Sequence, residues 1–402
     1  MNLHLTIGFL PLVDACLPIL AHEHGFAEEE GLTLDFVRDV SWATVLDRLL
    51  YAHTDAAHLI APLTIATTLG RGRPAQPLAT PFVLGLNGNA ITFGLDLATQ
   101  LGLGDALPDP AELGTKLRAL ATTRREAGRQ LRFGVVHRYS SHNYKLRYWL
   151  AACGIVPDRD VEITTVAPPF IADALAGGEI DGACVGEPWN SVCVERGVGV
   201  IGLATAQIWR RGVEKVLAFR ASTLEEKRAE AEALIRAMRK AGGHFVREEN
   251  WETNAAILAR REYLDQDAAL IMRAISDRLV LKKGHPAVYY SDFMFQHREA
   301  ANFPWISQAQ WLYSQMVRWD GLEYSDADAR LAGAVFRPDV YRSALKGLGD
   351  SLPGASSKVE GSLSRPTPVG AQSGSIILGE NTFFDGPSFD PDHIRAYLES
   401  LP

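Results

Sequence analysis

Strand-like and helix-like hydrophobic patterns alternate from the beginning of the chain. Apolar residues take every second position in residues 3–9, which is typical of a half-buried strand. Residues 17–24 predict a helix that ends at a glycine, and residues 32–37 predict a second strand. Residues 41–50 then predict a helix capped by Ser41, and a short buried strand follows at 56–60. This alternation predicts an α/β fold with a mostly parallel sheet covered by helices.

A second series of the same kind begins after residues 100–130, which show no strand pattern and predict a helical or loop insertion. Its expected elements are a strand at 132–136, a helix at 142–152, a strand at 161–166, a helix at 170–176 and a strand at 182–185. The segment 213–219 then returns the chain to the first series, and long helices follow at 224–246 and 253–261. The two series predict two lobes.

These patterns predict a clamshell of the periplasmic-binding-protein type II, in which two hinge crossings near residues 85–95 and 200–218 join the lobes and a ligand lies between them. The expected boundaries are lobe 1 at 1–90 with 205–348, lobe 2 at 91–204, a flexible Ser/Gly/Pro-rich strap at 349–375, and a C-terminal segment at 376–402 that docks on the body.

Composition excludes several classes of function. The chain has 402 residues and is therefore too long for one ordinary domain. Because 47% of its residues are hydrophobic, it can bury a large core. Its formal charge of −8 argues against direct nucleic-acid binding and against an anionic membrane as a partner. The four cysteines form no C-x-x-C pair, and the pairs His22/His24 and His53/His58 lack further ligands at metal-binding spacing. We therefore expect no metal, no cofactor and, without a Walker loop or a G-x-S-x-G motif, no enzyme activity.

The apolar residues 3–20 could be mistaken for a secretory segment. They have no Lys or Arg before them, they contain His4 and Asp14, and no small-x-small cleavage site follows. A cytoplasmic location is therefore expected. The sequence holds no later apolar run of about 18 residues, so we expect no membrane span.

Five candidate residues stand at junctions between elements and carry groups suited to binding a small oxyanion: Trp42, Asn89, His142, Gly186 and Lys215. The indole N–H of Trp42 and the amides of its helix N-terminus can donate to an oxygen. Asn89 follows a glycine in a predicted turn and offers two amide donors. The alternatives are a packing role for Trp42 and an ordinary turn at Asn89.

The other three candidates add donors, backbone and charge. His142 opens a predicted helix, whose dipole favours an anion and keeps the imidazole neutral. Gly186 ends a buried strand and lets backbone amides approach a ligand. Lys215 lies on an apolar strand, where a bound anion would supply its missing counter-charge. The alternatives are a solvent-facing His142 and a surface ion pair of Lys215 with Glu214 or Glu187.

Glu187 would repel an anion, so we expect it to have a structural or lobe-bridging role, with Trp189 packing beside it.

The five short segments that contain the candidate residues, taken in chain order, resemble those of the nitrate-binding and bicarbonate-binding members of the periplasmic solute-binding family, and the resemblance covers nearly the whole chain. The resemblance implies nitrate or nitrite as ligand, because in that family a lysine at the position of Lys215 accompanies nitrate, whereas bicarbonate binders carry an acidic residue there. The family tends to have Gln where this chain has Asn89. We expect Trp42, Asn89 and Lys215 towards the first lobe, and His142 and Gly186 on the second.

A cytoplasmic protein with such a site resembles the NasS type of nitrate/nitrite sensor within this family. That resemblance implies an ANTAR-type antiterminator response regulator (NasT-like) as partner, held by the unliganded sensor and released when the anion arrives. Two alternatives stay open. One is the solute-binding component of a nitrate ABC transporter whose leader is missing. The less favoured one is an enzyme like the thiamine-pyrimidine synthases, whose cysteine-rich motif this chain lacks.

Overall fold

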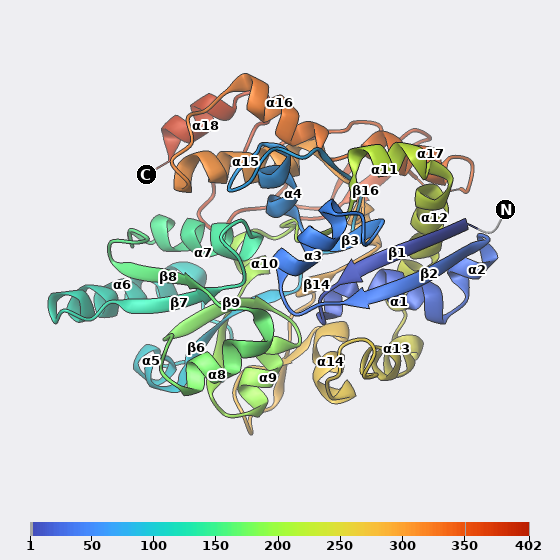
Figure 1. Ribbon diagram of the computed structural model, residues 1–402. Coiled ribbons are helices and arrows are strands. Elements are labelled where there is room, and N and C mark those ends of the chain that lie inside the picture. The colour runs from blue at the N-terminus through green and yellow to red at the C-terminus, as the bar shows by residue number, and fades with distance from the viewer. Residues whose placement is uncertain (1–2, 350, 402) are drawn as a thin grey trace.

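Two five-stranded sheets form the centre of the protein (Figure 1). The computed structural model describes residues 3–349 and 351–401; residues 1, 2, 350 and 402, which belong to the predicted ranges 1–90, 349–375 and 376–402, lie outside the described part. In Figure 1 the first sheet lies on the right, near the N-terminus, and the second lies on the left.

The first sheet has the strand order β2-β1-β3-β11-β4. Its strands are β1 (Leu3–Phe9), β2 (Leu32–Arg38), β3 (Ala56–Ile60), β4 (Leu78–Val83) and β11 (Lys215–Arg220). β1 runs parallel to β2 and β3, whereas β11 runs antiparallel to β3 and β4. Its first helices are α1 (Cys16–Glu23), α2 (Phe26–Glu29), α3 (Trp42–Leu50) and α4 (Ala61–Thr68), with η1 (Val13–Ala15) before α1. β3 is buried along its whole length, as the sequence predicts, although it contains His58.

The second sheet has the order β10-β6-β9-β7-β8. Its strands are β6 (Asn89–Gly94), β7 (Leu131–Val135), β8 (Val161–Thr165), β9 (Gly182–Gly186) and β10 (Gly199–Ala204). β7 is parallel to β8 and β9, and β6 is antiparallel to β9 and β10. The helices of this half are α5 (Leu95–Leu101), α6 (Pro110–Glu126), α7 (Ser141–Ala152), α8 (Ile171–Ala176) and α9 (Trp189–Glu195), with η2 (Pro168–Phe170) before α8.

The chain passes between the sheets twice. The first passage contains β5 (Leu86–Asn87) and the second contains α10 (Thr205–Ile208). Asn89, expected towards the first lobe, is instead the first residue of β6 and pairs with Gly186 in the second sheet. Asn87 and Gly88 have φ of 61° and 78°, so the chain turns before Asn89. The strand that begins there then pairs with distant β9, and this pairing places Asn89 in the second sheet.

The remaining elements pack around the two sheets. The helices are α11 (Ala221–Glu226), α12 (Arg228–Phe245), η3 (Glu248–Asn250), α13 (Trp251–Leu258), α14 (Ala268–Ile275), η4 (Arg298–Ala300), α15 (Ile306–Trp319), α16 (Asp326–Ala334), α17 (Pro338–Leu345) and α18 (Ile394–Ser400). The short strands are β12 (Arg278–Val280), β13 (Ala287–Tyr289), β14 (Met294–Phe295), β15 (Thr367–Gly370) and β16 (Ser375–Leu378). The expected helix 224–246 is divided, because Lys227 has φ −109° and ψ 41°.

The segment expected as a flexible strap pairs with the C-terminal segment in a β-hairpin and makes buried contacts. β15 and β16 pair antiparallel. The buried carboxylate of Glu360 accepts hydrogen bonds from Ser307 Oγ and from Asn381 Nδ2, each at 2.8 Å. Further along, the ring of Phe383 stacks on Trp209 with centroids 5.1 Å apart. These contacts attach the C-terminal part of the chain to the body.

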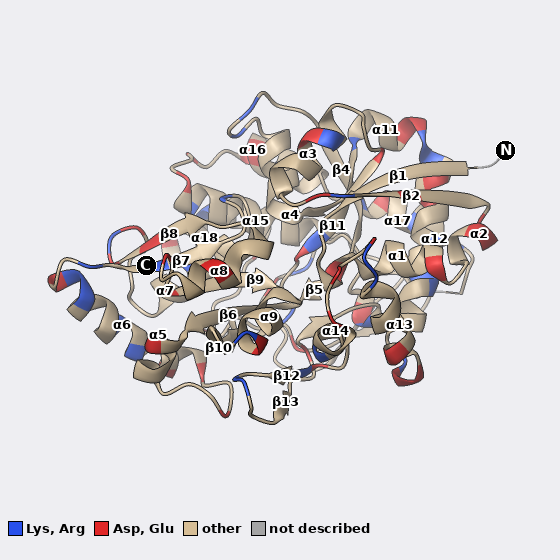
Figure 2. Cartoon of the chain, turned by 60° about the horizontal axis from the view of Figure 1, so that its bottom comes forward, with Lys and Arg blue, Asp and Glu red and all other residues tan. Residues whose placement is uncertain are grey.

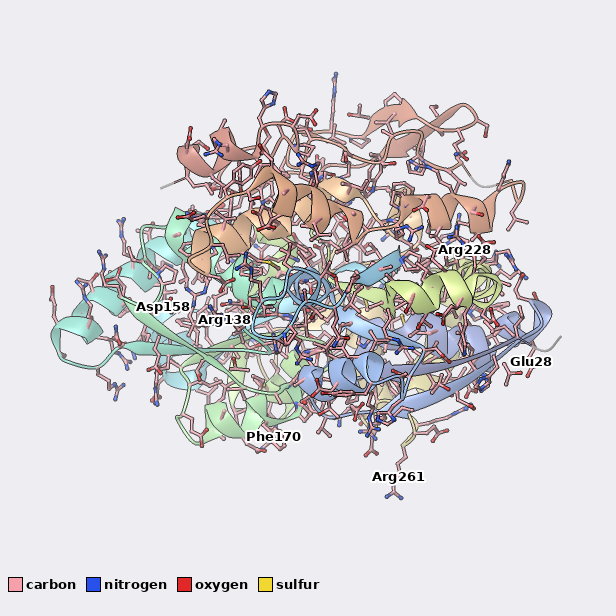
Figure 3. All side chains as sticks on the ribbon, turned by 45° about the horizontal axis from the view of Figure 1, so that its top comes forward. Glu28, Arg138, Asp158, Phe170, Arg228 and Arg261 are labelled. Carbon is pink, nitrogen blue, oxygen red and sulfur yellow. The ribbon has the colours of Figure 1, made fainter. Side chains whose placement is uncertain are left out.

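α15 borders both lobes. It packs against α4 of the first and against α7 of the second. Asp320, directly after α15, accepts from Tyr144 on α7 at 2.6 Å and from Arg138, which is labelled in Figure 3, at 3.1 Å. In Figure 2, both basic and acidic residues are visible on outer helices such as α6. Within the described residues, no helix has the length and apolarity needed to cross a membrane.

Candidate functional site

Four of the five candidate residues meet at the edge where the two sheets face each other. Lys215 begins β11, Asn89 begins β6, and Gly186 ends β9. Lys215 Nζ lies 3.1 Å from Asn89 Oδ1 and 3.4 Å from Nε2 of His142, which stands in the first turn of α7. A Cβ on Gly186 would lie 3.3 Å from the same Nζ, so only glycine leaves this approach open. The cluster therefore draws on both sheets.

Trp42 joins this cluster through His58 and Asp14, which the sequence did not indicate as site residues. Its ring centroid lies 5.3 Å from that of His58, and His58 Nε2 lies 2.8 Å from Asp14 Oδ1. The other oxygen of Asp14 lies 2.7 Å from Lys215 Nζ. The predicted cap at Ser41 is confirmed, because its hydroxyl accepts from the amide of Thr44 at 3.2 Å. The cap fixes the start of α3 and hence the position of the indole.

Lys215 is fully buried and has carboxylates as counter-charges. Asp14 is one and Glu214, 3.4 Å away, is the other. Glu214 also forms an ion pair of 2.7 Å with the buried Lys145 and accepts from Ser141 Oγ at 2.6 Å. Lys215 thus pairs with Glu214, as one alternative proposed, but the ion pair is buried and does not lie on the surface. A buried ammonium requires such charges, and the site holds two of each sign.

These neighbours determine the protonation states. Burial opposes the charge of Lys215, but Asp14 and Glu214 outweigh it and raise the lysine pKa above its ordinary value. Burial likewise raises the pKa of Asp14, yet Lys215 and His58 outweigh it and keep that pKa below the ordinary value. Burial, followed by the charge of Lys215, lowers the pKa of His142 to about 3. The neutral state predicted for His142 is confirmed, although burial rather than the helix dipole is the main cause.

The tautomer of His142 follows from its neighbour. Lys215 can only donate, so the facing Nε2 of His142 accepts and the ring proton belongs on Nδ1. Among the described residues, that Nδ1 has no hydrogen-bond partner, and neither has Nε1 of Trp42 or Nδ2 of Asn89, although all three atoms are buried. Buried polar groups in proteins are nearly always paired, and each unpaired one costs about 1–3 kcal/mol. Three N–H donors without acceptors, beside an ammonium group, form an arrangement that an oxyanion would satisfy.

The loop after β1 connects the two lobes at the edge of this cluster. The amide of Val13 donates to the carbonyl of Glu187 at 2.9 Å, and the indole of Trp189 donates to the carbonyl of Pro11 at 3.2 Å. Glu187 therefore bridges the lobes through its backbone, while its carboxylate is buried and accepts from the amide of Ser191 at 3.2 Å. Burial raises the pKa of Glu187 to about 7. Among the described residues, no group of three or more His, Cys, Asp or Glu could hold a metal ion.

Two βα lobes, two crossings and a polar cluster at their junction define the two-lobed fold that solute-binding proteins share. The crystal structure of the periplasmic nitrate-binding protein NrtA from Synechocystis PCC 6803 superposes with a TM-score of 0.85 and 26% identity, over 99% of this chain and 98% of that one. The alkanesulfonate-binding protein SsuA from Xanthomonas axonopodis pv. citri shares the fold, with a TM-score of 0.55 and 15% identity over 82% of this chain and 94% of that one. The predicted periplasmic-binding-protein fold with two lobes is confirmed.

Residues 2–259 match the sequence model of the NMT1-like family, and the chain belongs to that family. The nitrate/nitrite binding protein NrtA of Nostoc sp. (strain PCC 7120) is 29% identical in an alignment that covers 98% of this chain and 84% of the relative. The bicarbonate transport ATP-binding protein CmpC of Synechococcus elongatus is 30% identical in an alignment that covers 100% of this chain and 55% of CmpC. The chain therefore spans about half the length of that relative.

Proposed function

We propose that the protein binds nitrate or nitrite between its lobes, and that the ligand contacts Trp42, Asn89, His142, Gly186 and Lys215. The three unpartnered donors on Trp42, Asn89 and His142 carry this proposal, because a planar monoanion offers oxygens in several directions. The ammonium of Lys215 supplies the charge. The similarity to proteins named for nitrate and nitrite binding supports the choice of ligand.

The small size of the ligand limits the mechanism. Nitrate has only four heavy atoms, so its binding free energy reaches at most roughly −6 kcal/mol. Moving a two-state equilibrium from roughly 1:99 to 99:1 takes about 5.5 kcal/mol of differential affinity. Nearly all of the binding energy must therefore distinguish the closed from the open lobes. Donors from both sheets meet this requirement, since Asn89 and His142 belong to the second lobe and Trp42 and Lys215 to the first.

The direct test is a titration followed by tryptophan fluorescence, because Trp42 is one of the proposed contacts. We expect nitrate and nitrite to change the emission, and bicarbonate and chloride to have no effect at the same ionic strength. In Lys215→Glu the nitrate response should disappear, because a carboxylate replaces the cation. Unchanged nitrate affinity in this variant would rule out the proposed site.

We further propose that the protein acts in the cytoplasm as a nitrate/nitrite sensor of the NasS type, with an ANTAR-type antiterminator response regulator (NasT-like) as its partner. Residues 3–20 fold into β1, η1 and α1, so this apolar segment has a structural role. The test is co-purification with the regulator. We expect a complex without nitrate and its loss when nitrate is added; a complex insensitive to the anion would contradict the sensor role.

The second candidate function is that of a solute-binding component of a nitrate importer, which the periplasmic location in the name of the Synechocystis NrtA favours. Cell fractionation separates the two, because an import component is found outside the cytoplasm. The enzyme alternative has less support. Burial raises the pKa of every cysteine thiol, in Cys16, Cys153, Cys184 and Cys193, so none is prepared as a thiolate nucleophile.

A further inference from the structure

The two carboxylates beside Lys215 are held differently. Glu214 has Lys145 and Ser141 as further partners, so it stays paired when Lys215 moves. Among the described residues, Asp14 has only His58 besides Lys215 to pair with its carboxylate. If Lys215 turned towards a bound anion, Asp14 would be left ionised with a neutral imidazole as its remaining partner.

The charges around Asp14 balance without a ligand. The buried titratable groups of the cluster are Asp14 on η1, Cys16 on α1, His58 on β3, His142 and Lys145 on α7, Cys184 on β9, Glu214 directly before β11, and Lys215 at its start. Burial keeps both thiols and both imidazoles neutral. The carboxylates of Asp14 and Glu214 therefore face the ammonium groups of Lys145 and Lys215. α14, which packs against η1, carries Arg273, and this arginine pairs with Glu195. A monoanion would leave the buried cluster with an uncompensated negative charge, which is unfavourable.

We infer that the protein takes up its anion together with one proton, and that Asp14 is the residue that accepts this proton. The inference rests on the proposed nitrate site. Lys215 Nζ exchanges its contact with Asp14 Oδ2 for the anion, solvent supplies a proton, and an O–H bond forms on Asp14. The net charge of the cluster returns to zero. Asp14 thereby determines specificity, because a dianion such as sulfate would require a second proton.

The forces on Asp14 agree with this exchange. Burial by itself raises the pKa of its carboxyl, and the charge of Lys215 is the largest single influence that holds the pKa down. Its neighbour His58 stays neutral, because burial lowers the pKa of that imidazole more than Asp14 raises it. When the ammonium of Lys215 turns to the anion, burial becomes the main influence on the carboxyl of Asp14 and raises its pKa.

Calorimetry of the full chain tests the inference with nitrate as the probe. Nitrate is the anion of a strong acid, so any proton that accompanies it must reside on the protein. Titrations in buffers of different ionisation enthalpy give the number of protons taken up, and we expect about one per nitrate with an affinity that falls about tenfold per pH unit. Glu187→Gln serves as background, because the pKa of Glu187 is about 7 and its carboxylate points to Ser191. In that background, difference infrared spectra should show a new protonated carboxyl band when nitrate binds.

Two substitutions complete the test. Asp14→Asn should bind nitrate without proton uptake and, at about pH 8, at least about tenfold more tightly than the unmodified chain. Asp35→Asn is the matched control, because His4 and Asp35 form the same kind of pair at 2.8 Å on the surface, and it should leave proton uptake unchanged. Nitrate binding with no proton uptake and no carboxyl band overturns the inference and leaves the proposed function intact. No nitrate binding by the unmodified chain overturns both.

Discussion

Replacing Lys215 by methionine should cost stability as well as binding, and the size of the cost follows from the buried charges. Methionine keeps an unbranched side chain as far as Cε and removes the ammonium, which lies 2.7 Å from Asp14 and 3.4 Å from Glu214. Glu214 keeps its ion pair with Lys145, whereas Asp14 loses its cation. The folded variant can avoid a buried unpaired charge by protonating Asp14.

That protonation limits the loss. The ordinary pKa of an aspartate is 3.8, so protonating Asp14 at about pH 7 costs at most about 4 kcal/mol, and at about pH 5 about 2 kcal/mol. Breaking a buried ion pair by removing one partner costs about 3–5 kcal/mol in other proteins, which agrees with the first value. The sign is fixed: in the variant Asp14 has a raised pKa in the folded state, so stability falls as pH rises above the unfolded-state value.

Urea unfolding followed by circular dichroism measures this loss at both pH values. A compensated variant, Lys215→Met with Asp14→Asn, leaves Glu214 and Lys145 as a neutral pair and should regain most of the stability without regaining nitrate binding. The reasoning is refuted if Lys215→Met loses less than about 1 kcal/mol at about pH 7, or if the loss is equal at both pH values. It is also refuted if the double variant is no more stable than the single one.

Three further substitutions separate packing, bridging and titration. Gly186→Ala places a Cβ 2.8 Å from Leu12 Cδ2 and 3.0 Å from Asn89 Oδ1, so it should cost about 1–3 kcal/mol in unfolding experiments and weaken nitrate binding. The control is Gly134→Ala on β7 of the same sheet. Its Cβ would lie 2.9 Å from Ile180 Cδ1, so it should cost stability and leave nitrate affinity unchanged. Tyr144→Phe removes the bond to Asp320 and should lower the free energy of unfolding by about 1.5–3 kcal/mol, whereas a change below 0.5 kcal/mol, measured by the same method, would contradict a structural bond there. Glu187→Gln should stabilise the protein by about 3 kcal/mol at about pH 8 and by little at about pH 4, because the folded-state pKa of about 7 exceeds the ordinary 4.5 and stability is lost as pH rises between them; a pH-independent effect would contradict this assignment.

The sequence predicted those parts of the site that local rules determine. A cap such as Ser41 and a glycine at the end of a buried strand such as Gly186 reveal element ends from their own neighbours, and parallel strands bring their ends to one edge. Asp14 and His58 were not predicted as site residues. Asp14 was considered only as a charge within an apolar segment, and His58 only as part of a histidine pair that lacks further metal ligands. A more useful signal was available: a charged or titratable residue within a buried segment requires a partner elsewhere in the fold.

The lobe of Asn89 was wrong for a related reason. The Asn-Gly segment correctly indicates a turn, but which sheet receives the next strand depends on pairing with β9, more than ninety residues further along the chain. The segment 351–375 shows the same limit. Its composition is typical of a linker, yet one buried carboxylate, Glu360, with partners on α15 and on the C-terminal segment, holds it against the body. Composition describes local freedom, and a tertiary contact can remove it.

The C-terminal contacts also bear on how so small a ligand can move two lobes. α7 carries His142 at its first turn and Tyr148 two turns later, and the hydroxyl of Tyr148 donates to Asp385 at 2.9 Å. Tyr144 on the same helix donates to Asp320. Because α15 packs against both lobes, wide opening would have to break these bonds together with the lobe contacts at the site. Restricting the opening keeps the free-energy difference between the open and closed states small, and a small difference is the only kind that a ligand delivering about 6 kcal/mol can reverse.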